Sequence, residues 1–172
     1  MGGCAIVPPA NDQGTLPTMT DPTRRFDLDE FLPYLLNQAA EATSHEFQSV
    51  YRDRYGFTRT QWRVLANLGK FGAMTARDIC AISHIEKTKV SRAVAALEQA
   101  GMLSRTPSTT DRRAEVLALT PKGHTVFAEL GKLAQGFDQH LRDALGQNEA
   151  AKLVSILRQL AKGGAGLRQK GD

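Results

Sequence analysis

The segment from Lys87 to Arg92 combines long cationic side chains with short hydroxyl side chains. Lys87, Lys89 and Arg92 are basic, and Thr88 and Ser91 add small hydrogen-bonding groups. Such side chains bind phosphate oxygens and form hydrogen bonds with the edges of bases. On the exposed side of a helix, this set suits binding to a nucleic acid. An ordinary amphipathic helix with a solvated polar side would also show this pattern.

A second group, Asp111, Arg112 and Arg113, continues a run of turn residues that begins at Ser108. An arginine at the tip of a hairpin can insert into a narrow minor groove, where the potential is most negative. Asp111 could hold one guanidinium in place through a bidentate pair. A solvated turn with a local ion pair is the simpler alternative.

The sequence predicts elements that would position both groups. A short helix, a three-residue turn and a longer helix are expected over Thr75–Ile82, Ser83–Ile85 and Glu86–Ala100. Two strands are expected over Met102–Pro107 and Glu115–Leu119. Apolar residues mark the inward sides of the two helices, namely Ile79 and Ile82 in the first and Val90, Val94 and Leu97 in the second. This order describes a winged helix-turn-helix, whose second helix enters the major groove.

Apolar stripes predict further helices on both sides of this unit. The first begins near Asp27 or Asp29 and runs to about Arg54, with Pro33 tolerated in its first turn. A second helix begins at Thr58, which forms a capping box with Gln61. After Thr120, a long helix runs from Pro121 to about Ala144, and a last one spans about Asn148–Ala161.

Composition and charge narrow the class of protein. Of the 172 residues 41% are hydrophobic, which excludes a wholly disordered chain. The sequence lacks a transmembrane run and a secretory signal, and its two cysteines, Cys4 and Cys80, form no disulfide framework, so we expect a cytoplasmic protein. Residues 52–113 hold 12 basic and 5 acidic side chains, whereas residues 1–51 hold 2 and 7. A basic middle segment favours a polyanionic partner.

Several motifs together resemble one family. The sequences TARDICAISHIEKTKVSRAVAALEQAGMLSR and DRRAEVLALTPKG, within Thr75–Gly123, closely resemble the MarR (multiple antibiotic resistance regulator) family. The spacing of Asp111 and Arg113 to Leu-Thr-x-x-Gly also fits, as does FTRTQWRVL at Phe57–Leu65. The resemblance covers about Leu28 to Leu160 and leaves residues 1–25 outside.

The resemblance implies a mainly α fold with a small β-hairpin wing, in which a winged helix-turn-helix lobe joins a helical dimerisation region. The expected organisation is a flexible tail at 1–25, a first dimerisation helix at 27–56, the DNA-binding lobe at 57–120, dimerisation helices at 121–162 and a frayed tail at 163–172. The resemblance also implies a homodimeric regulator that binds a pseudo-palindromic operator of double-stranded DNA. In this family such a regulator is more often a repressor. Two recognition helices would then lie about 34–36 Å apart.

The family's DNA-binding roles fall on particular residues of this chain. The recognition helix would use Thr88, Lys89, Ser91 and Arg92, beside Lys87. The wing would use Arg113, oriented by Asp111, with Arg112 at phosphate.

The resemblance also implies a small-molecule effector, either an aromatic acid or an acyl thioester. Candidate lining residues are Phe31, Tyr34, Gln38, His45, Trp62 and Arg63. Arg63 would pair with a carboxylate while Trp62 stacks on a ring. Alternatively, Trp62 and Tyr34 belong to the core, and Arg63 is a surface or phosphate contact.

Other classes of function find less support in the sequence. A redox-responsive regulator of the same fold would need a reactive cysteine, but Cys80 lies among isoleucines and Cys4 lies in the tail. A helical protein-binding module without DNA binding would leave the two basic groups without a partner. The four histidines are scattered, so we expect no metal, and the sequence has no phosphate loop, nucleophile elbow or nucleotide fingerprint. We therefore expect neither an enzyme nor a cofactor.

Overall fold

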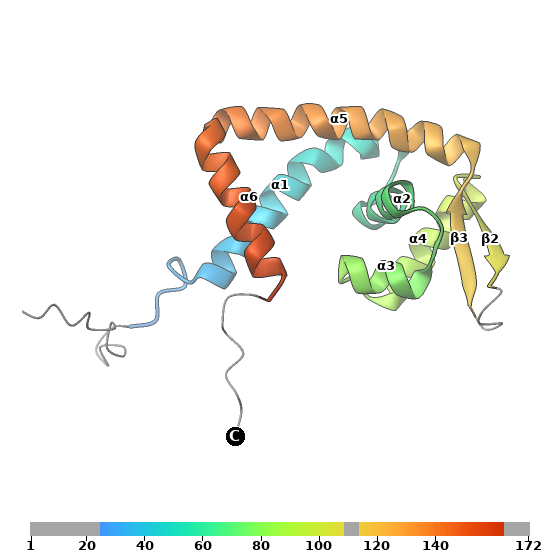
Figure 1. Cartoon of the computed structure of the whole chain (residues 1–172), viewed down its shortest axis with the longest axis horizontal. Coiled ribbons are helices and arrows are strands. Elements are labelled where there is room, and N and C mark those ends of the chain that lie inside the picture. Colours follow the sequence, from blue (N-terminus) through green and yellow to red (C-terminus); the bar gives the residue numbers. More distant parts are fainter. Residues whose placement is uncertain (1–24, 109–113, 164–172) are drawn as a thin grey trace, which may run out of the picture. The chain divides into compact units, whose positions relative to one another are not determined.

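The computed structural model describes residues 25–108 and 114–163 (Figure 1). Its elements follow in the order α1 (Leu32–Tyr55), α2 (Arg59–Phe71), β1 (Met74–Thr75), α3 (Ala76–Ser83), α4 (Lys87–Gln99), β2 (Leu103–Pro107), β3 (Glu115–Leu119), α5 (Pro121–Leu145) and α6 (Gln147–Ala161). The predicted fold class, mainly α with a small β-hairpin wing, is confirmed. The chain divides into two compact units, Met1–Ala39 and Ala40–Asp172.

The described part of the first unit holds a turn and the beginning of α1. The backbone N–H of Asp29 donates to the carboxylate of Asp27 at 3.0 Å, which forms a local turn ahead of the helix. The predicted start of the helix near Asp27 or Asp29 was therefore too early, because α1 begins at Leu32. Pro33 lies in the first turn, as predicted.

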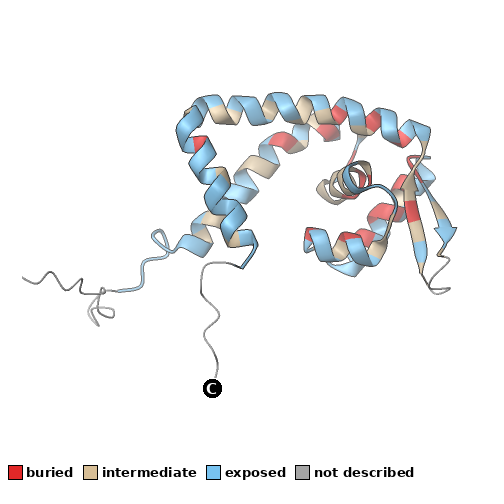
Figure 2. Cartoon of the chain, viewed as in Figure 1, coloured by how far each residue is buried: buried red, intermediate tan, exposed pale blue. Residues whose placement is uncertain are grey.

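In the second unit, one hydrophobic core joins the last part of α1, α2, α3, α4, the sheet and the first half of α5 (Figure 2). The predicted inward residues of α4, Val90, Val94 and Leu97, are all buried in it. On α5 the buried apolar residues are Val126 and Leu130, both near its beginning. The core therefore lies directly behind the helix-turn-helix and holds its elements in place.

Three helices begin at a threonine whose hydroxyl accepts a backbone N–H. Thr58 and Gln61 form the predicted capping box of α2, with each side chain bonded to the other residue's backbone. Thr75 and Asp78 do the same at α3. Thr120 caps α5 ahead of Pro121. Local hydrogen bonds thus fix where these helices begin.

The sheet is three-stranded and antiparallel, in the order β1-β3-β2. The predicted hairpin is confirmed, since β2 and β3 pair from Leu103 opposite Leu119 to Pro107 opposite Glu115. β1 was not predicted, because two residues are too few to show an alternating pattern. It pairs with the middle of β3, where Met74 lies opposite Leu117.

The predicted inward position of Ile82 in α3 is wrong. Its side chain is 48% exposed, whereas Ile79 and Ser83 are buried. A residue four positions after Ile79 returns to the same side of a helix, and here that residue is a serine. Its hydroxyl accepts a hydrogen bond from Asn67 in α2 at 2.9 Å, so this polar group can be buried.

Candidate nucleic-acid interface

The residues predicted to bind DNA on α4 share one exposed surface. Ala93 is buried along with the predicted apolar residues of this helix. The other side of its first half is open to solvent and carries the cations and hydroxyls, namely Lys87, Thr88, Lys89, Ser91 and Arg92. The structure therefore brings these five residues together on a helix whose opposite side is held by the core.

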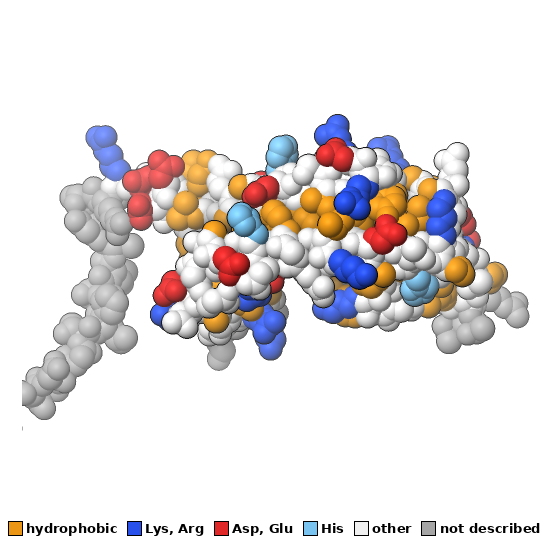
Figure 3. All heavy atoms as spheres, turned by 90° about the horizontal axis from the view of Figure 1, so that it is seen from above, with side chains coloured by type: hydrophobic (Ala, Val, Ile, Leu, Met, Phe, Trp, Pro, Cys, Tyr) orange, Lys and Arg blue, Asp and Glu red, His pale blue; other side chains and the backbone are white. Residues whose placement is uncertain are grey.

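The charges at the beginning of α4 remain available to an anionic partner. The Lys89 ammonium lies 3.3 Å from the Glu86 carboxylate, and both side chains are mostly exposed. Such a surface ion pair contributes little to stability, so Lys89 can readily leave Glu86 for a more strongly charged anion. Among the described residues, no ion pair involves Lys87 or Arg92. The face seen from above in Figure 3, on the side where Figure 1 draws α5, instead carries a mixture of basic and acidic side chains.

The predicted wing residues Asp111, Arg112 and Arg113 lie outside the described residues. The hairpin on either side of them is described, and the N–H of Ser108 donates to the carbonyl of Ala114 at 2.9 Å. This hydrogen bond continues the ladder beyond Pro107 and Glu115. Residues 109–113 are thus the connection between two paired strands, which is where a wing tip was predicted.

Arg105 in β2 ties the hairpin to α4 and was not found by sequence reasoning. Its Nε donates to Glu98 in α4 at 2.8 Å, and a terminal guanidinium nitrogen donates to Glu115 in β3 at 3.0 Å. These carboxylates raise the pKa of Arg105, so it stays charged. An arginine that bridges two carboxylates links the hairpin to α4, and its positive charge is already matched by theirs. The only sign of this role in the sequence was the opposite charge of Glu115, which lies on the other strand of the predicted hairpin.

The other end of α4 is joined to the beginning of α5. The Lys122 ammonium donates to the carbonyl of Ala100 at 2.9 Å, and the Thr120 hydroxyl donates to that of Gly101 at 2.7 Å. Gly123 is buried against the backbone of Met102, and a Cβ at this position would collide with the Met102 carbonyl oxygen. We name these residues, Ala100–Met102 with Thr120, Lys122 and Gly123, the α4–α5 junction.

The predicted effector-binding residues fall in both units. Phe31, Tyr34 and Gln38 belong to the first unit, where the Gln38 amide donates to the Tyr34 hydroxyl at 2.7 Å. His45 is exposed on the part of α1 that belongs to the second unit. Trp62 is half-buried in an aromatic cluster. Its ring stacks on that of Tyr51 with 6.0 Å between the ring centroids, and it meets the ring of Phe47 edge-on with 5.8 Å between the centroids.

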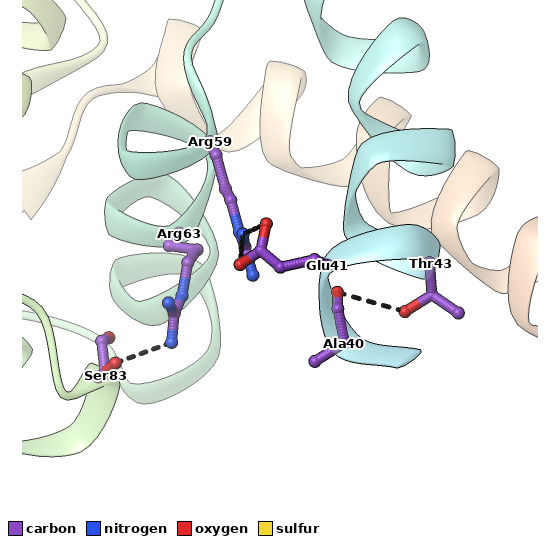
Figure 4. Close-up of polar contacts among 6 residues, drawn as sticks. All are labelled: Ala40, Glu41, Thr43, Arg59, Arg63 and Ser83. Carbon is purple, nitrogen blue, oxygen red and sulfur yellow. Dashed lines mark hydrogen bonds and ion pairs between the residues drawn. The ribbon is translucent and has the colours of Figure 1, made fainter. Parts of the chain in front are cut away.

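Arg63 and Arg59 lie one turn apart on α2 and have different partners (Figure 4). The Arg63 guanidinium donates to the carbonyl of Ser83 at 2.7 Å, whereas Arg59 forms an ion pair with Glu41 of α1 at 2.7 Å. Burial lowers the pKa of Arg63, and the nearby charge of Arg59 lowers it further, but a guanidinium remains protonated at any physiological pH. Arg63 is therefore a charged donor bound to a neutral carbonyl.

Other kinds of site find no support in the part of the chain that the structure describes. No three His, Cys, Asp or Glu residues there are grouped as metal ligands. Cys80 is half-buried and packs against the core. None of the described helices is both long and apolar enough to cross a membrane.

A paired short helix and exposed recognition helix, followed by a hairpin, define this protein as a winged helix-turn-helix DNA-binding protein. Comparison with known proteins agrees. The family model described as MarR family matches residues 55–114. The HTH-type transcriptional repressor MdtR of Bacillus subtilis is 33% identical over 110 residues, which are 64% of this chain and 71% of MdtR. The chain belongs to the MarR family and is a DNA-binding transcriptional regulator.

Two further relatives align over most of their length. The HTH-type transcriptional regulator FarR of Neisseria gonorrhoeae is 27% identical over 127 residues, covering 74% of this chain and 86% of FarR. A structure of BpsR of Bordetella bronchiseptica, whose DNA binding is regulated by 6-hydroxynicotinic acid, has a TM-score of 0.71 at 25% identity. That alignment covers 80% of this chain and 98% of BpsR.

The α4–α5 junction generates a prediction about stability. Gly123→Ala should lower the free energy of unfolding by about 1–3 kcal/mol, because the new methyl group forces the α5 backbone away from Met102. Urea unfolding followed by circular dichroism would measure the change. The matched control is Gly136→Ala in the same helix, where a Cβ has open space. That variant should gain up to about 1 kcal/mol from helix propensity alone. Equal effects in the two variants would contradict the tight junction.

Proposed function

We propose that this protein is a homodimeric repressor that binds a pseudo-palindromic operator and releases it on binding a small aromatic acid or an acyl thioester. The observation that carries the proposal is the two-sided character of α4. One side of this helix is buried in the core, and the other side exposes three cations and two hydroxyls. Repression is favoured by the relative MdtR, which is named a repressor. A dimer seated over a promoter blocks transcription without further contacts.

In the proposed complex, α4 lies in the major groove. Arg92 and Ser91 would reach base edges, and Lys87, Thr88 and Lys89 would bind phosphates at the beginning of the helix. Arg113 would enter the minor groove beside the hairpin, oriented by Asp111, with Arg112 at phosphate. The fixed hairpin supports this arrangement, since Arg105 holds its strands against α4.

Dimerisation is proposed to use α1, α5 and α6. An apolar row on α6 supports this, because Leu153, Ile156 and Leu157 are exposed although they recur at helical spacing. In the first unit, Phe31, Leu32 and Leu35 of the region around the start of α1 are also exposed. Covering such rows with a second copy would remove apolar area from water.

The effector proposal rests on Trp62 and Arg63 in the second unit. An aromatic acid offers a ring for Trp62 and a carboxylate for Arg63, and the relative BpsR responds to a compound of this kind, 6-hydroxynicotinic acid. We propose that His45, which lies in the same unit as Trp62 and Arg63, also lines the site.

The DNA-binding proposal predicts that Arg92→Ala and Arg113→Ala each weaken specific binding by about 1–3 kcal/mol. The measurement is fluorescence anisotropy on the DNA upstream of the protein's own gene, or on the duplex that the wild type selects from a random pool. A scrambled duplex and a salt series are run in parallel. Lys132→Ala, which removes an exposed charge from α5, is the control and should bind like the wild type. Unchanged affinity in both arginine variants at the same salt concentration would refute the docking.

The dimer proposal predicts that Ile156→Asp shifts the protein towards monomer, because a charge would be buried in an apolar interface. The side chain of Ile156 is 54% exposed in the single chain, so the substitution should leave the fold of the lobe intact. Sedimentation equilibrium measures the dimer dissociation constant. Ser155→Asp, at the exposed position directly before Ile156, is the matched control. A monomeric wild type, or an Ile156→Asp variant that dimerises as tightly, would exclude this interface.

The effector proposal predicts that an aromatic acid or its thioester weakens DNA binding and changes the fluorescence of Trp62, the single tryptophan of the chain. A panel that begins with 6-hydroxynicotinic acid is titrated against the protein alone and against its DNA complex. In the protein without DNA, Arg63→Ala should weaken the change in Trp62 fluorescence caused by carboxylates more than Arg59→Ala does. If no compound changes either signal, the assignment of an aromatic acid fails.

A further inference from the structure

Ser83, the last residue of α3, is held by two side chains of α2. The Arg63 guanidinium donates to its carbonyl at 2.7 Å, and the Asn67 amide donates to its hydroxyl at 2.9 Å (Figure 4 shows the first of these contacts). The same Asn67 amide also donates to the carbonyl of Arg63 at 2.7 Å. Ser83 is the only buried polar residue in the described part of the chain. We name Arg63, Asn67 and Ser83 the turn clamp.

The clamp lies immediately before α4, which has no side-chain cap of its own. Glu86 is the N-cap residue and forms no capping hydrogen bond, in contrast to the threonines that cap α2, α3 and α5. His84 between the helices adopts a left-handed backbone with φ of 51°, which a non-glycine residue rarely adopts. The beginning of α4 therefore depends on neighbouring elements for its position.

The polar contacts of the turn clamp help to hold the beginning of α4 in place, in addition to the apolar packing of Ile85 and Val90. The last carbonyls of a helix lack partners within the helix, and Arg63 satisfies one of them with a charged donor. Because the partner is a main-chain atom, the contact fixes the path of the chain from α3 into the turn. Only three residues, His84–Glu86, separate the clamp from Lys87.

We propose that Arg63 and Asn67 are positioning residues for specific DNA recognition, which act through Ser83 to fix the first turn of α4. This inference rests on the proposed docking of α4 in the major groove. Base recognition needs α4 in one orientation, and a variant that populates this orientation less often binds its site more weakly in proportion. Binding to phosphates is tolerant of orientation and depends chiefly on charge. Loss of the clamp should therefore reduce specificity more than overall DNA binding.

The test compares wild type, Arg63→Ala, Arg63→Lys and Asn67→Ala on two duplexes. One is the duplex that the wild type selects from a random pool, and the other is a scrambled duplex of equal composition. In Arg63→Ala and Asn67→Ala, the ratio of the two affinities should fall about tenfold, as a buried polar partner is left unsatisfied. Affinity for the scrambled duplex should change little. The midpoint of thermal unfolding should fall by a few degrees, and both variants should remain folded at the temperature of the binding assay. Arg63→Lys, which keeps a charged donor, should recover part of the ratio.

Arg59→Ala is the matched control, because it removes the same charge one turn away on α2 while its partner, Glu41, lies in α1. Its ratio should stay within about twofold of the wild type, since it leaves the clamp intact. Amide hydrogen exchange of residues 83–90 gives a readout without DNA and should be faster in Arg63→Ala and Asn67→Ala, but not in Arg59→Ala.

The outcomes separate the two proposals. If the wild type selects no site, the proposed function fails, and the exchange of residues 83–90 still decides whether the clamp holds the turn. If the wild type selects a site and folded Arg63→Ala and Asn67→Ala variants keep its affinity ratio, the positioning role is overturned. If the affinity ratio falls equally in Arg59→Ala, the loss is due to charge alone. This result would also overturn the positioning role of Arg63.

Discussion

The structure depends on burying one side of α4 while its opposite side stays in water. Val90, Val94 and Leu97 are within 2% of complete burial, so the helix cannot rotate without exposing them. Burial of three such side chains is worth several kcal/mol, at about 1.5–3 kcal/mol each. This constraint fixes which residues face outward, and those residues are the basic and hydroxyl side chains. Packing in the core thus determines the chemistry of the surface.

Much of this arrangement was predictable because its causes are local in the sequence. Helix periodicity predicted α4 and its buried side. The capping box of Thr58 and Gln61 predicted the beginning of α2, and Thr120 followed by Pro121 predicted that of α5. The long-range contacts were not predictable. The bond from Asn67 to Ser83 joins residues 16 apart, and it explains why Ser83 rather than Ile82 points inward. A pattern of apolar residues cannot reveal a polar partner on another helix.

The candidate site shows the same division between local and long-range causes. Sequence reasoning found the exposed residues of α4 from their types and spacing, because exposure follows from helical phase. It missed Arg105, whose two carboxylate partners lie on different elements. It assigned Arg63 to effector binding or to the surface, and the structure gives this residue a partner in Ser83. Family resemblance supplied the roles of individual residues, and those roles remain predictions for this chain.

Polar contacts to main-chain carbonyls hold the chain shortly before and directly after α4, one from α2 and one from α5. Before the helix, Arg63 reaches the carbonyl of Ser83, and after it, Lys122 reaches that of Ala100. The helix α5 then continues without a break for 25 residues, or about 37 Å, and the chain turns at Gly146 into α6, which carries the apolar row. In the proposed dimer, α5 would connect the interface formed by α6 to the end of α4. Under the proposed function, an effector would therefore not need to contact α4 directly.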